Sequence, residues 1–216
     1  MNQRPLTLAL PKGRLLKQLA PRLSAAGVSA ATLDMADRRL VRESPWRDDP
    51  AGLRILLLKP DDVPTYVEHG AADVGVVGRD VLLERGADLA LPYETGLGRC
   101  RMVVAAPAER ASTSHDPVLR VASKYPRIAA RHFAQRGIEV EIIYVQGSVE
   151  TAPLTGLSHV IVDLVETGET LRQNGLVELE TVCEVSAVMV ANRTRLKLRR
   201  ARIDALGAQL AGPLQS

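Results

Sequence analysis

The chain has 216 residues, of which 46% are hydrophobic and only 3% aromatic. This length allows one large domain or two small lobes, with a core of aliphatic side chains. Six aromatic residues are too few for the stacking platforms of single-strand binders, and the formal charge is only +3, so no nucleic-acid partner is expected. No apolar run reaches membrane-spanning length and no export signal opens the sequence, so we expect a cytoplasmic protein without a membrane partner.

Short apolar runs alternate with helical patterns from the first residues onward. Expected strands lie at 6–10, 54–59 and 72–78, and expected helices at 13–27, 61–70 and 79–86. The pattern then restarts, with strands expected at 101–107, 120–123, 139–145, 159–165 and 185–194 and helices at 126–137 and 194–211. The strands are apolar on both sides, which is typical of a parallel sheet covered by helices. The basic stretch 193–202 is expected to be the solvated face of the last helix, with inward-facing leucines and isoleucine at 198, 203, 206 and 210.

The two series of elements predict an α/β fold with two lobes. Lobe I would comprise residues 1–92 and 185–216, with substrate and subunit contacts, and lobe II residues 93–184. Strands near 92–104 and 178–188 would run from one lobe to the other and leave an interlobe cleft, where ligands of α/β proteins tend to bind. Cys100 and Cys183 show no metal-ligand spacing and are expected to be reduced core residues.

The segment "VIVDLVETGETL" (160–171) leads from a buried strand into a turn and a helix start. The first N–H groups of a helix lack intrahelical partners and attract anions together with the helix dipole. Gly168 permits close approach of the backbone, Thr167 and Thr170 add hydroxyl donors, and Asp163 can accept both hydrogen bonds of a vicinal diol. This order predicts a ribose 5-phosphate pocket; the alternative is a strand, a threonine cap and a helix without a ligand.

This segment resembles the donor loop of phosphoribosyltransferases, in which an apolar strand precedes an acid and TGxTL. Leu164 follows Asp163, where the purine and pyrimidine enzymes have a second acid; here the second acid is Glu166. Further stretches resemble, in the same order, the short form of the ATP phosphoribosyltransferase family, the first enzyme of histidine biosynthesis. They are LALPKGRLL, DVPTYVEHGAADVGVVGRDVL, GRCRMVVA, ASKYP, GSVETAPLTGLSHVIVDLVETGETLRQNGL and VMVANR, and together they span about residues 6 to 195.

The resemblance implies two lobes in the type II periplasmic-binding-protein arrangement. It implies transfer of phosphoribose from phosphoribosyl diphosphate to N1 of ATP, with release of pyrophosphate. Mg²⁺ would be carried mainly by the substrate phosphates, because the departing pyrophosphate needs its charge neutralised. A homodimer would assemble with a regulatory subunit resembling histidyl-tRNA synthetase into a hetero-octamer.

Carried over to lobe II, the resemblance assigns the phosphoribosyl diphosphate donor to Asp163, Glu166, Thr167, Gly168, Glu169 and Thr170. Asp163 would hold the ribose hydroxyls and, with Glu166, act near the reacting sugar. The carboxylate of Glu169 would point to solvent, while its backbone N–H would donate a hydrogen bond to the phosphate. Glu150 would lie in the active site and contact ATP or pyrophosphate. The alternatives are a dipole-favoured first-turn acid at Glu166 and, around Glu150, an ordinary helix start capped by a residue at 148 or 151.

In lobe I, Lys12, Gly13 and Arg14 follow the first strand and would contact ATP or pyrophosphate. Arg14 is expected to be catalytic, as is Arg38, which matches a family arginine associated with the leaving group. The alternatives are ordinary loop cations for the first set and, for Arg38, a solvated pair with its neighbour at 39.

The segment "GVVGRDVL" has both a functional and a structural interpretation. Gly78 and Arg79 would border the nucleotide. Gly78 is also expected to form a tight turn, and Asp80 to cap the following helix.

Two rival functions remain open on the sequence. A solute receptor or the effector domain of a transcription regulator would share two α/β lobes, but the chain has no export signal and no room for a DNA-binding segment. A phosphoribosyltransferase for a free base is disfavoured by the lone acid at Asp163.

Overall fold

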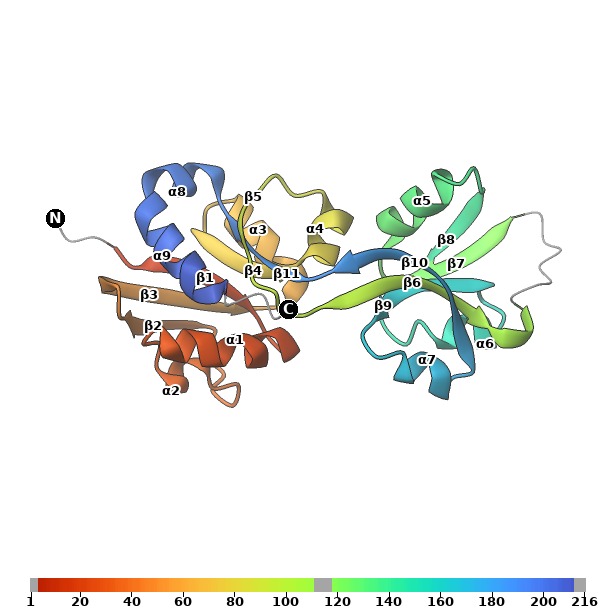
Figure 1. Ribbon diagram of the computed structural model, residues 1–216, viewed down its shortest axis with the longest axis horizontal. Helices are drawn as coiled ribbons and strands as arrows, with labels where there is room; N and C mark the ends of the chain where they lie inside the picture. The colour runs from red at the N-terminus through yellow and green to blue at the C-terminus, as the bar shows by residue number, and fades with distance from the viewer. Residues whose placement is uncertain (1–3, 111–117, 212–216) are drawn as a thin grey trace. The chain divides into compact units, whose positions relative to one another are not determined.

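The computed structural model describes residues 4–110 and 118–211, which form two compact units (Figure 1). Unit 1 contains the chain up to Leu82, residues 86–98 and the part from Ser186 onward. Unit 2 contains residues 83–85 and 99–185. The chain therefore passes from unit 1 to unit 2 after Gly98 and returns to unit 1 after Val185.

Unit 1 is built on a six-stranded mixed sheet with the order β2-β3-β1-β4-β11-β5. The strands are β1 (Leu6–Pro11), β2 (Val41–Trp46), β3 (Asp49–Leu58), β4 (Val74–Gly78), β5 (Ala90–Glu94) and β11 (Ala187–Ala191). Strand β1 runs parallel to β3 and β4, whereas β2, β11 and β5 run antiparallel to their neighbours. All six residues of β1 are buried because both faces of the sheet are covered.

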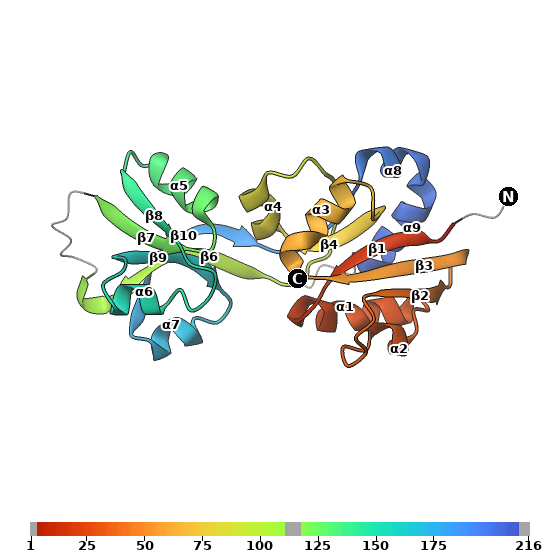
Figure 2. The same ribbon diagram turned by 180° about the vertical axis from the view of Figure 1, so that it is seen from behind.

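Helices cover the two faces of this sheet (Figures 1 and 2). They are α1 (Arg14–Ala25), α2 (Ala30–Leu33), the 3₁₀ turn η1 (Pro60–Asp62), α3 (Val63–Glu68), α4 (Arg79–Arg85), α8 (Arg193–Leu198) and α9 (Arg200–Leu210). On one face, Leu19 of α1 and Leu206 of α9 share a core with Leu8 of β1. On the other face, Val67 of α3 packs in a core with Ala9. The 3.6-residue spacing of leucines in α1 places one apolar stripe on the sheet.

Unit 2 is built on a five-stranded sheet with the order β10-β6-β9-β7-β8. Its elements are β6 (Cys100–Pro107), η2 (Ala108–Arg110), β7 (Leu119–Ser123), α5 (Pro126–Ala134), β8 (Val140–Tyr144), α6 (Thr151–Leu154), β9 (Val160–Val165), α7 (Glu169–Gln173) and β10 (Leu176–Val185). Strands β7, β8 and β9 are parallel, so their carboxyl ends lie at one edge. Helix α5 packs on one face, and α6 and α7 pack on the other.

The α/β fold with two sheets is confirmed, and each sheet contains the expected parallel strands, but antiparallel strands beside them make both sheets mixed. Strand β2 was not predicted. Its residues alternate between exposed and buried because it forms the edge of the unit 1 sheet, so it lacks the continuous apolar run used to find strands.

The C-terminal prediction needs three corrections. The helix expected at 194–211 is two helices, because Arg199 leaves helical geometry (φ −129°, ψ 26°). Ile203, Leu206 and Leu210 are buried as predicted, but Leu198 is 70% exposed. The strand expected at 185–194 is interrupted at Ser186, so it comprises the last residue of β10 and the whole of β11. In the same way, the crossing strand expected near 92–104 is divided into β5 and β6 by residues 95–99.

Cys100 of β6 and Cys183 of β10 form no disulfide, and both are half-buried, whereas the sequence predicted core residues. Within residues 4–110 and 118–211, no helix is long and apolar enough to cross a membrane. The same residues contain no group of three histidine, cysteine or acidic side chains that would hold a metal ion.

Candidate active site

Asp163 lies near the carboxyl end of β9, the central strand of the unit 2 sheet. The strand pairs with β6 on one side and β7 on the other, so its backbone is fixed by two ladders. The N–H of Leu164 donates a 2.8 Å hydrogen bond to Oδ1 of Asp163 and holds the carboxylate at the start of the turn. A rigid strand end is a suitable place for an acceptor that must keep its position.

Burial raises the pKa of Asp163 to about 6, from an ordinary value of 3.8. The hydrogen bond from Leu164 opposes the shift, Glu150 raises the pKa further by like-charge repulsion, and the nearby ammonium group of Lys124 lowers it. These influences show that Glu150 and Lys124 share the electrostatic environment of Asp163. Lys124 directly follows β7 in the segment ASKYP, and no role was predicted for it.

The turn after β9 places Gly168 at the N-cap of α7 in the left-handed conformation (φ 77°, ψ 1°). Thr167 and Thr170 are exposed, and the N–H of Glu169 is 3.4 Å from Oγ1 of Thr167, a long hydrogen bond that an incoming oxyanion can replace. The helix has only five residues, so the backbone amides of the turn matter more than a helix dipole. The predicted strand, turn and helix start are confirmed as local structure.

The carboxylate of Glu169 turns along α7 and away from the turn. It pairs with Arg172, three residues later, and accepts a 2.7 Å hydrogen bond from Nε2 of Gln173. The side chain is 47% exposed. This orientation agrees with the expectation that only the backbone of Glu169 faces a phosphate.

A second ion pair lies beside the turn and was not predicted. Arg101 of β6 and Glu178 of β10 pair at 2.7 Å, and Oε1 of Glu178 would be 3.2 Å from a Cβ placed on Gly168. The pair joins neighbouring strands, so sequence order gave no signal for it. The Glu178 carboxylate leaves little room for a side chain at position 168.

Glu150 precedes α6 at its N-cap position, next to the buried Val149. The predicted cap by Ser148 or Thr151 is wrong: α6 has no side-chain cap, and Oγ1 of Thr151 instead donates to the carbonyl of Ser148 at 2.8 Å. Ser148 has a positive φ of 49°, unique among the described non-glycine residues. Such a conformation is rare for residues with a side chain and recurs at functional turns.

In unit 1, Lys12, Gly13 and Arg14 connect β1 to α1. The N–H of Lys12 extends the sheet ladder to Leu58 at 2.8 Å, and Gly13 has a φ of 96° at the N-cap of α1. Gly13 and Arg14 are exposed, and a Cβ on Gly13 would meet no atom within 4 Å. A glycine is therefore required at position 13 for its positive φ, and not because a side chain would lack space.

Arg38 lies exposed in the loop between α2 and β2, and an arginine that was not predicted to have a role organises this loop. The buried guanidinium of Arg42 donates to four main-chain carbonyls, at distances of 2.6 to 2.9 Å. The acceptors are the carbonyls of Thr32, Asp34, Asp37 and Arg39. Arg42 appears in the sequence as one residue of an alternating edge strand, which gave no indication of this role.

The start of α4 differs from the prediction. Gly78 is the N-cap in an extended conformation (φ −68°), not a tight turn, and Asp80 lies in the first turn of α4 and not at its N-cap. The carboxylate of Asp80 instead occupies the space that a Cβ on Gly78 would need. Arg79 pairs with Glu94 of β5, and its N–H donates to the carbonyl of Ser186 at 3.0 Å.

The predicted residues therefore form groups within each unit. In unit 2, Glu150, Asp163 and the turn 166–170 belong to segments at or just beyond the carboxyl ends of parallel strands. In unit 1, the segments 12–14 and 78–79 follow β1 and β4, which are neighbouring parallel strands, whereas Arg38 lies in a separate loop. Substrate sites of open α/β sheets lie at such carboxyl ends.

Two α/β units define the class of protein, which includes two-lobed solute-binding proteins of the type II periplasmic arrangement. The periplasmic aliphatic sulphonate-binding protein SsuA from Escherichia coli aligns with a TM-score of 0.60, covering 96% of this chain and 68% of that one. Its 15% sequence identity makes this a similarity of fold alone.

Comparison of the sequence with known families identifies the family, which the similarity of fold does not. The model of the HisG family, ATP phosphoribosyltransferase, matches residues 59–212, and the chain belongs to this family. ATP phosphoribosyltransferase from Sorangium cellulosum is 56% identical over 213 residues, covering 97% of this chain and 98% of that protein. The solved ATP phosphoribosyltransferase (HisG:HisZ) complex from Thermotoga maritima contains a chain with 34% identity and a TM-score of 0.81, covering 95% of this chain and 96% of that one.

Proposed function

We propose that the turn after β9 binds the phosphoribosyl diphosphate donor of the family reaction. The main support is the local geometry of one continuous segment. It contains an acid held at a strand end, a glycine in the left-handed conformation and two exposed threonines. In this proposal, the amides and hydroxyls of Thr167, Gly168, Glu169 and Thr170 donate to the 5-phosphate. Asp163 accepts from the ribose hydroxyls.

The chain catalyses the reaction of its family, the first step of histidine biosynthesis. Phosphoribose passes from phosphoribosyl diphosphate to N1 of ATP, which gives N1-(5-phosphoribosyl)-ATP and pyrophosphate. The bond from C1 of the sugar to the pyrophosphate oxygen breaks, and a bond from C1 to N1 forms. Both substrates are polyanions, so the protein must position them and offset their repulsion.

The proposed residues divide the charge stabilisation between them. Positive character develops on the sugar as pyrophosphate leaves, and Glu166 and Glu150 would stabilise it from nearby carboxylates. Lys12, Gly13 and Arg14 would bind ATP or pyrophosphate, with Gly78 and Arg79 bordering the nucleotide. Arg14 and Arg38 would stabilise the negative charge of the leaving group, for which planar guanidinium groups are suited. The predicted cleft between the lobes stays a prediction.

Mg²⁺ suits this arrangement without a dedicated protein cage. Asp163 and Glu150 provide two interacting carboxylates, and Mg²⁺ is commonly held by one or two carboxylates together with substrate phosphates. The described residues hold no larger cluster of candidate ligands, so most of its ligands would be phosphate oxygens. The ion would neutralise charge on the departing pyrophosphate.

The reaction is tested by incubating the chain with phosphoribosyl diphosphate, Mg²⁺ and either ATP or free nucleobases, while measuring pyrophosphate. We expect release that requires ATP. The assay is run with and without the partner subunit described below. Release with a free base in place of ATP, or none with either acceptor in the presence of the partner, would refute the proposal.

Replacing Arg38 tests its part in the chemical step. We expect Arg38→Ala to lower the single-turnover rate by roughly 10- to 100-fold, the effect of one charge-assisted hydrogen bond, with a smaller change in donor affinity. The matched control is Arg39→Ala, because Arg39 is 81% exposed and pairs with Asp37 in the same loop. Equal rates in wild type and Arg38→Ala would remove Arg38 from the mechanism.

Replacing Glu169 tests whether its side chain contributes to donor binding. We expect Glu169→Thr to leave the affinity for phosphoribosyl diphosphate unchanged or to tighten it, because the carboxylate faces Arg172 and its removal takes a negative charge from the phosphate turn. Isothermal titration calorimetry with the donor and Mg²⁺ measures this. A clear weakening would show a direct role for the carboxylate.

We also propose that the chain works with a regulatory subunit. The support is the similarity to the HisG chain of the Thermotoga maritima HisG:HisZ complex, which this chain covers almost completely. A homodimer of this chain would join a subunit resembling histidyl-tRNA synthetase in a hetero-octamer, in the cytoplasm where its substrates are found. Native mass spectrometry of the purified complex tests the stoichiometry. Histidine inhibition should need the partner, and full histidine sensitivity of this chain alone would contradict the proposal.

A further inference from the structure

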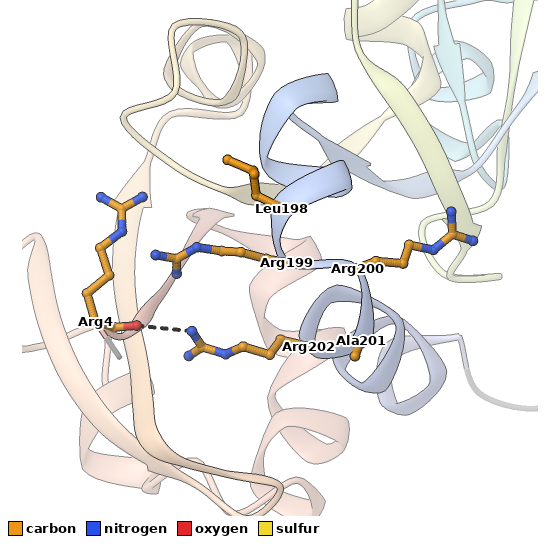
Figure 3. A pocket seen from close by; sticks show the side chains of 6 residues that line it. All are labelled: Arg4, Leu198, Arg199, Arg200, Ala201 and Arg202. Carbon is orange, nitrogen blue, oxygen red and sulfur yellow. Dashed lines mark hydrogen bonds between the residues drawn. The ribbon is translucent and has the colours of Figure 1, made fainter. Parts of the chain in front are cut away.

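A basic cavity of about 360 Å³ lies in unit 1 (Figure 3). Its lining residues are Arg4, Leu198, Arg199, Arg200, Ala201 and Arg202. Arg4 precedes β1 and Lys12 follows it, so the six residues of the strand separate them by roughly 20 Å. Because α/β substrate sites lie at the carboxyl ends of strands, this cavity at the amino end of β1 belongs to a different place in the unit.

The first part of the cluster surrounds one buried acid. Asp73 is 1% exposed and accepts a 2.9 Å hydrogen bond from the N–H of Thr7. Three guanidinium groups reach the same carboxylate, those of Arg4 at 3.2 Å, Arg195 at 3.4 Å and Arg199 at 3.5 Å. One ion pair would be enough to balance the charge of Asp73, so two further cations are held beside it.

The cluster also contains two arginines that each pair with an acid of their own. Arg202 pairs with Asp49, and its Nη1 donates to the carbonyl of Arg4 at 3.0 Å (Figure 3). Arg200 pairs with Asp204 at 2.7 Å. Each of these pairs is neutral, so the excess of two positive charges around Asp73 remains. In Figure 3 the side chains of Arg199 and Arg202 point toward Arg4, whereas Arg200 points away.

The crowding has an electrostatic consequence at Arg199. Burial lowers the pKa of its guanidinium, Asp73 opposes this, and repulsion from Arg4, Arg202 and Arg195 lowers the pKa further. Like charges held together in a partly buried place are destabilising unless an anion relieves them. If the arginines served only to neutralise the buried carboxylate of Asp73, one of the three would be enough.

We propose that this cavity binds a phosphate group. A phosphate dianion matches the excess of two positive charges, and guanidinium forks bind its oxygens in pairs. Arg4 is 53% exposed and therefore accessible to a ligand from solvent. The cavity is at the lower end of the range for small-molecule sites, which suits inorganic phosphate or the phosphate of a mononucleotide.

The test is a titration of the full chain followed by NMR of the arginine Nε–Hε groups, at constant ionic strength. The probes are inorganic phosphate, AMP and adenosine. We expect phosphate and AMP to shift the resonances of Arg4, Arg199 and Arg202, and adenosine to leave them unchanged. A response to AMP alone would identify a nucleotide as the source of the phosphate group, and a response to both would identify the phosphate group itself as sufficient.

Variants establish where the anion binds. Arg4→Gln should weaken binding about tenfold, because it removes the most exposed of the three guanidinium groups that reach Asp73, while Arg195 and Arg199 still pair with this acid. The matched control is Arg193→Gln, an equally basic position that is 62% exposed, pairs with Asp88 and does not line the cavity; it should stay within about twofold.

A second variant, Arg200→Gln, is available should Arg4→Gln fold poorly, since Arg200 lines the cavity and is 68% exposed. It should weaken binding at least about threefold, because the positive field of the cavity falls by one charge. Three results would overturn the proposal: shifts confined to the turn 166–170, equal weakening in Arg193→Gln, or an adenosine response equal to that of AMP.

Discussion

Asp163→Asn is expected to lower kcat/KM by about 10²- to 10³-fold, since each hydrogen bond from a ribose hydroxyl to a charged acceptor contributes about 1.5 kcal/mol or more. The substituted amide keeps an oxygen that can accept the 2.8 Å hydrogen bond from Leu164, so the local backbone should not change. Steady-state kinetics with varied phosphoribosyl diphosphate measures the effect. Activity within threefold of wild type would show that Asp163 does not hold the donor.

The same substitution should stabilise the folded protein. The folded-state pKa of Asp163, about 6, lies above its ordinary value of 3.8, so the folded state binds the proton more tightly than the unfolded chain. This contribution to stability is complete below about pH 4 and is lost as pH rises through 6. At pH 7 the wild type carries the cost of an ionised, partly buried carboxylate, and Asp163→Asn should raise the free energy of unfolding by about 1 to 3 kcal/mol.

Urea denaturation at pH 4 and pH 7 measures this difference. A gain in stability at pH 7 that shrinks at pH 4, together with lost activity, would separate a functional acid from a structural one. In the wild type, kcat/KM should rise with pH around 6 as Asp163 ionises, and the variant should lack this rise. A variant less stable than wild type at pH 7 would contradict the electrostatic account.

Gly168→Ala is expected to raise the KM for phosphoribosyl diphosphate by at least about tenfold, equivalent to about 1.4 kcal/mol of binding. At φ 77° an alanine is strained, and its Cβ would be 3.2 Å from Oε1 of Glu178, so we expect the strain to shift the turn and the Glu178 carboxylate to move aside. A shifted turn no longer directs its amides to one phosphate. The strain itself should cost about 1 kcal/mol of stability.

The control for this variant is Gly175→Ala. Gly175 follows the same helix, has a φ of 70°, and its Cβ would meet no atom within 4 Å. It should therefore lose a similar amount of stability while the KM stays within about twofold of wild type. Equal increases in KM for the two variants would mean that general loosening of α7, and not loss of the phosphate turn, causes the effect.

The features predicted well from the sequence are those that depend on contiguous residues. The turn 166–170 is fixed by a strand, a glycine and a helix start within twelve residues, so local geometry was sufficient to find it. The raised pKa of Asp163 was not predictable, because it comes mainly from burial of the carboxylate in the folded unit, and Glu150, which raises the pKa further, belongs to a separate segment.

Side chains that change role with their tertiary environment account for the other differences. Arg42 occurs in an alternating edge strand, but its buried guanidinium binds four carbonyls of the loop that carries Arg38. The arginines at 195, 199 and 202 were expected to face solvent and instead pair with Asp73 and Asp49, acids distant in sequence. Neither pairing leaves a periodic signal, because long-range partners are fixed only when the chain has folded.

The most direct test of the central claim is a crystal structure with phosphoribosyl diphosphate and Mg²⁺. The account predicts the 5-phosphate within about 3 Å of the backbone nitrogens of residues 167–170, with both ribose hydroxyls donating to Asp163. A donor bound elsewhere, with these amides not contacting phosphate, would contradict it.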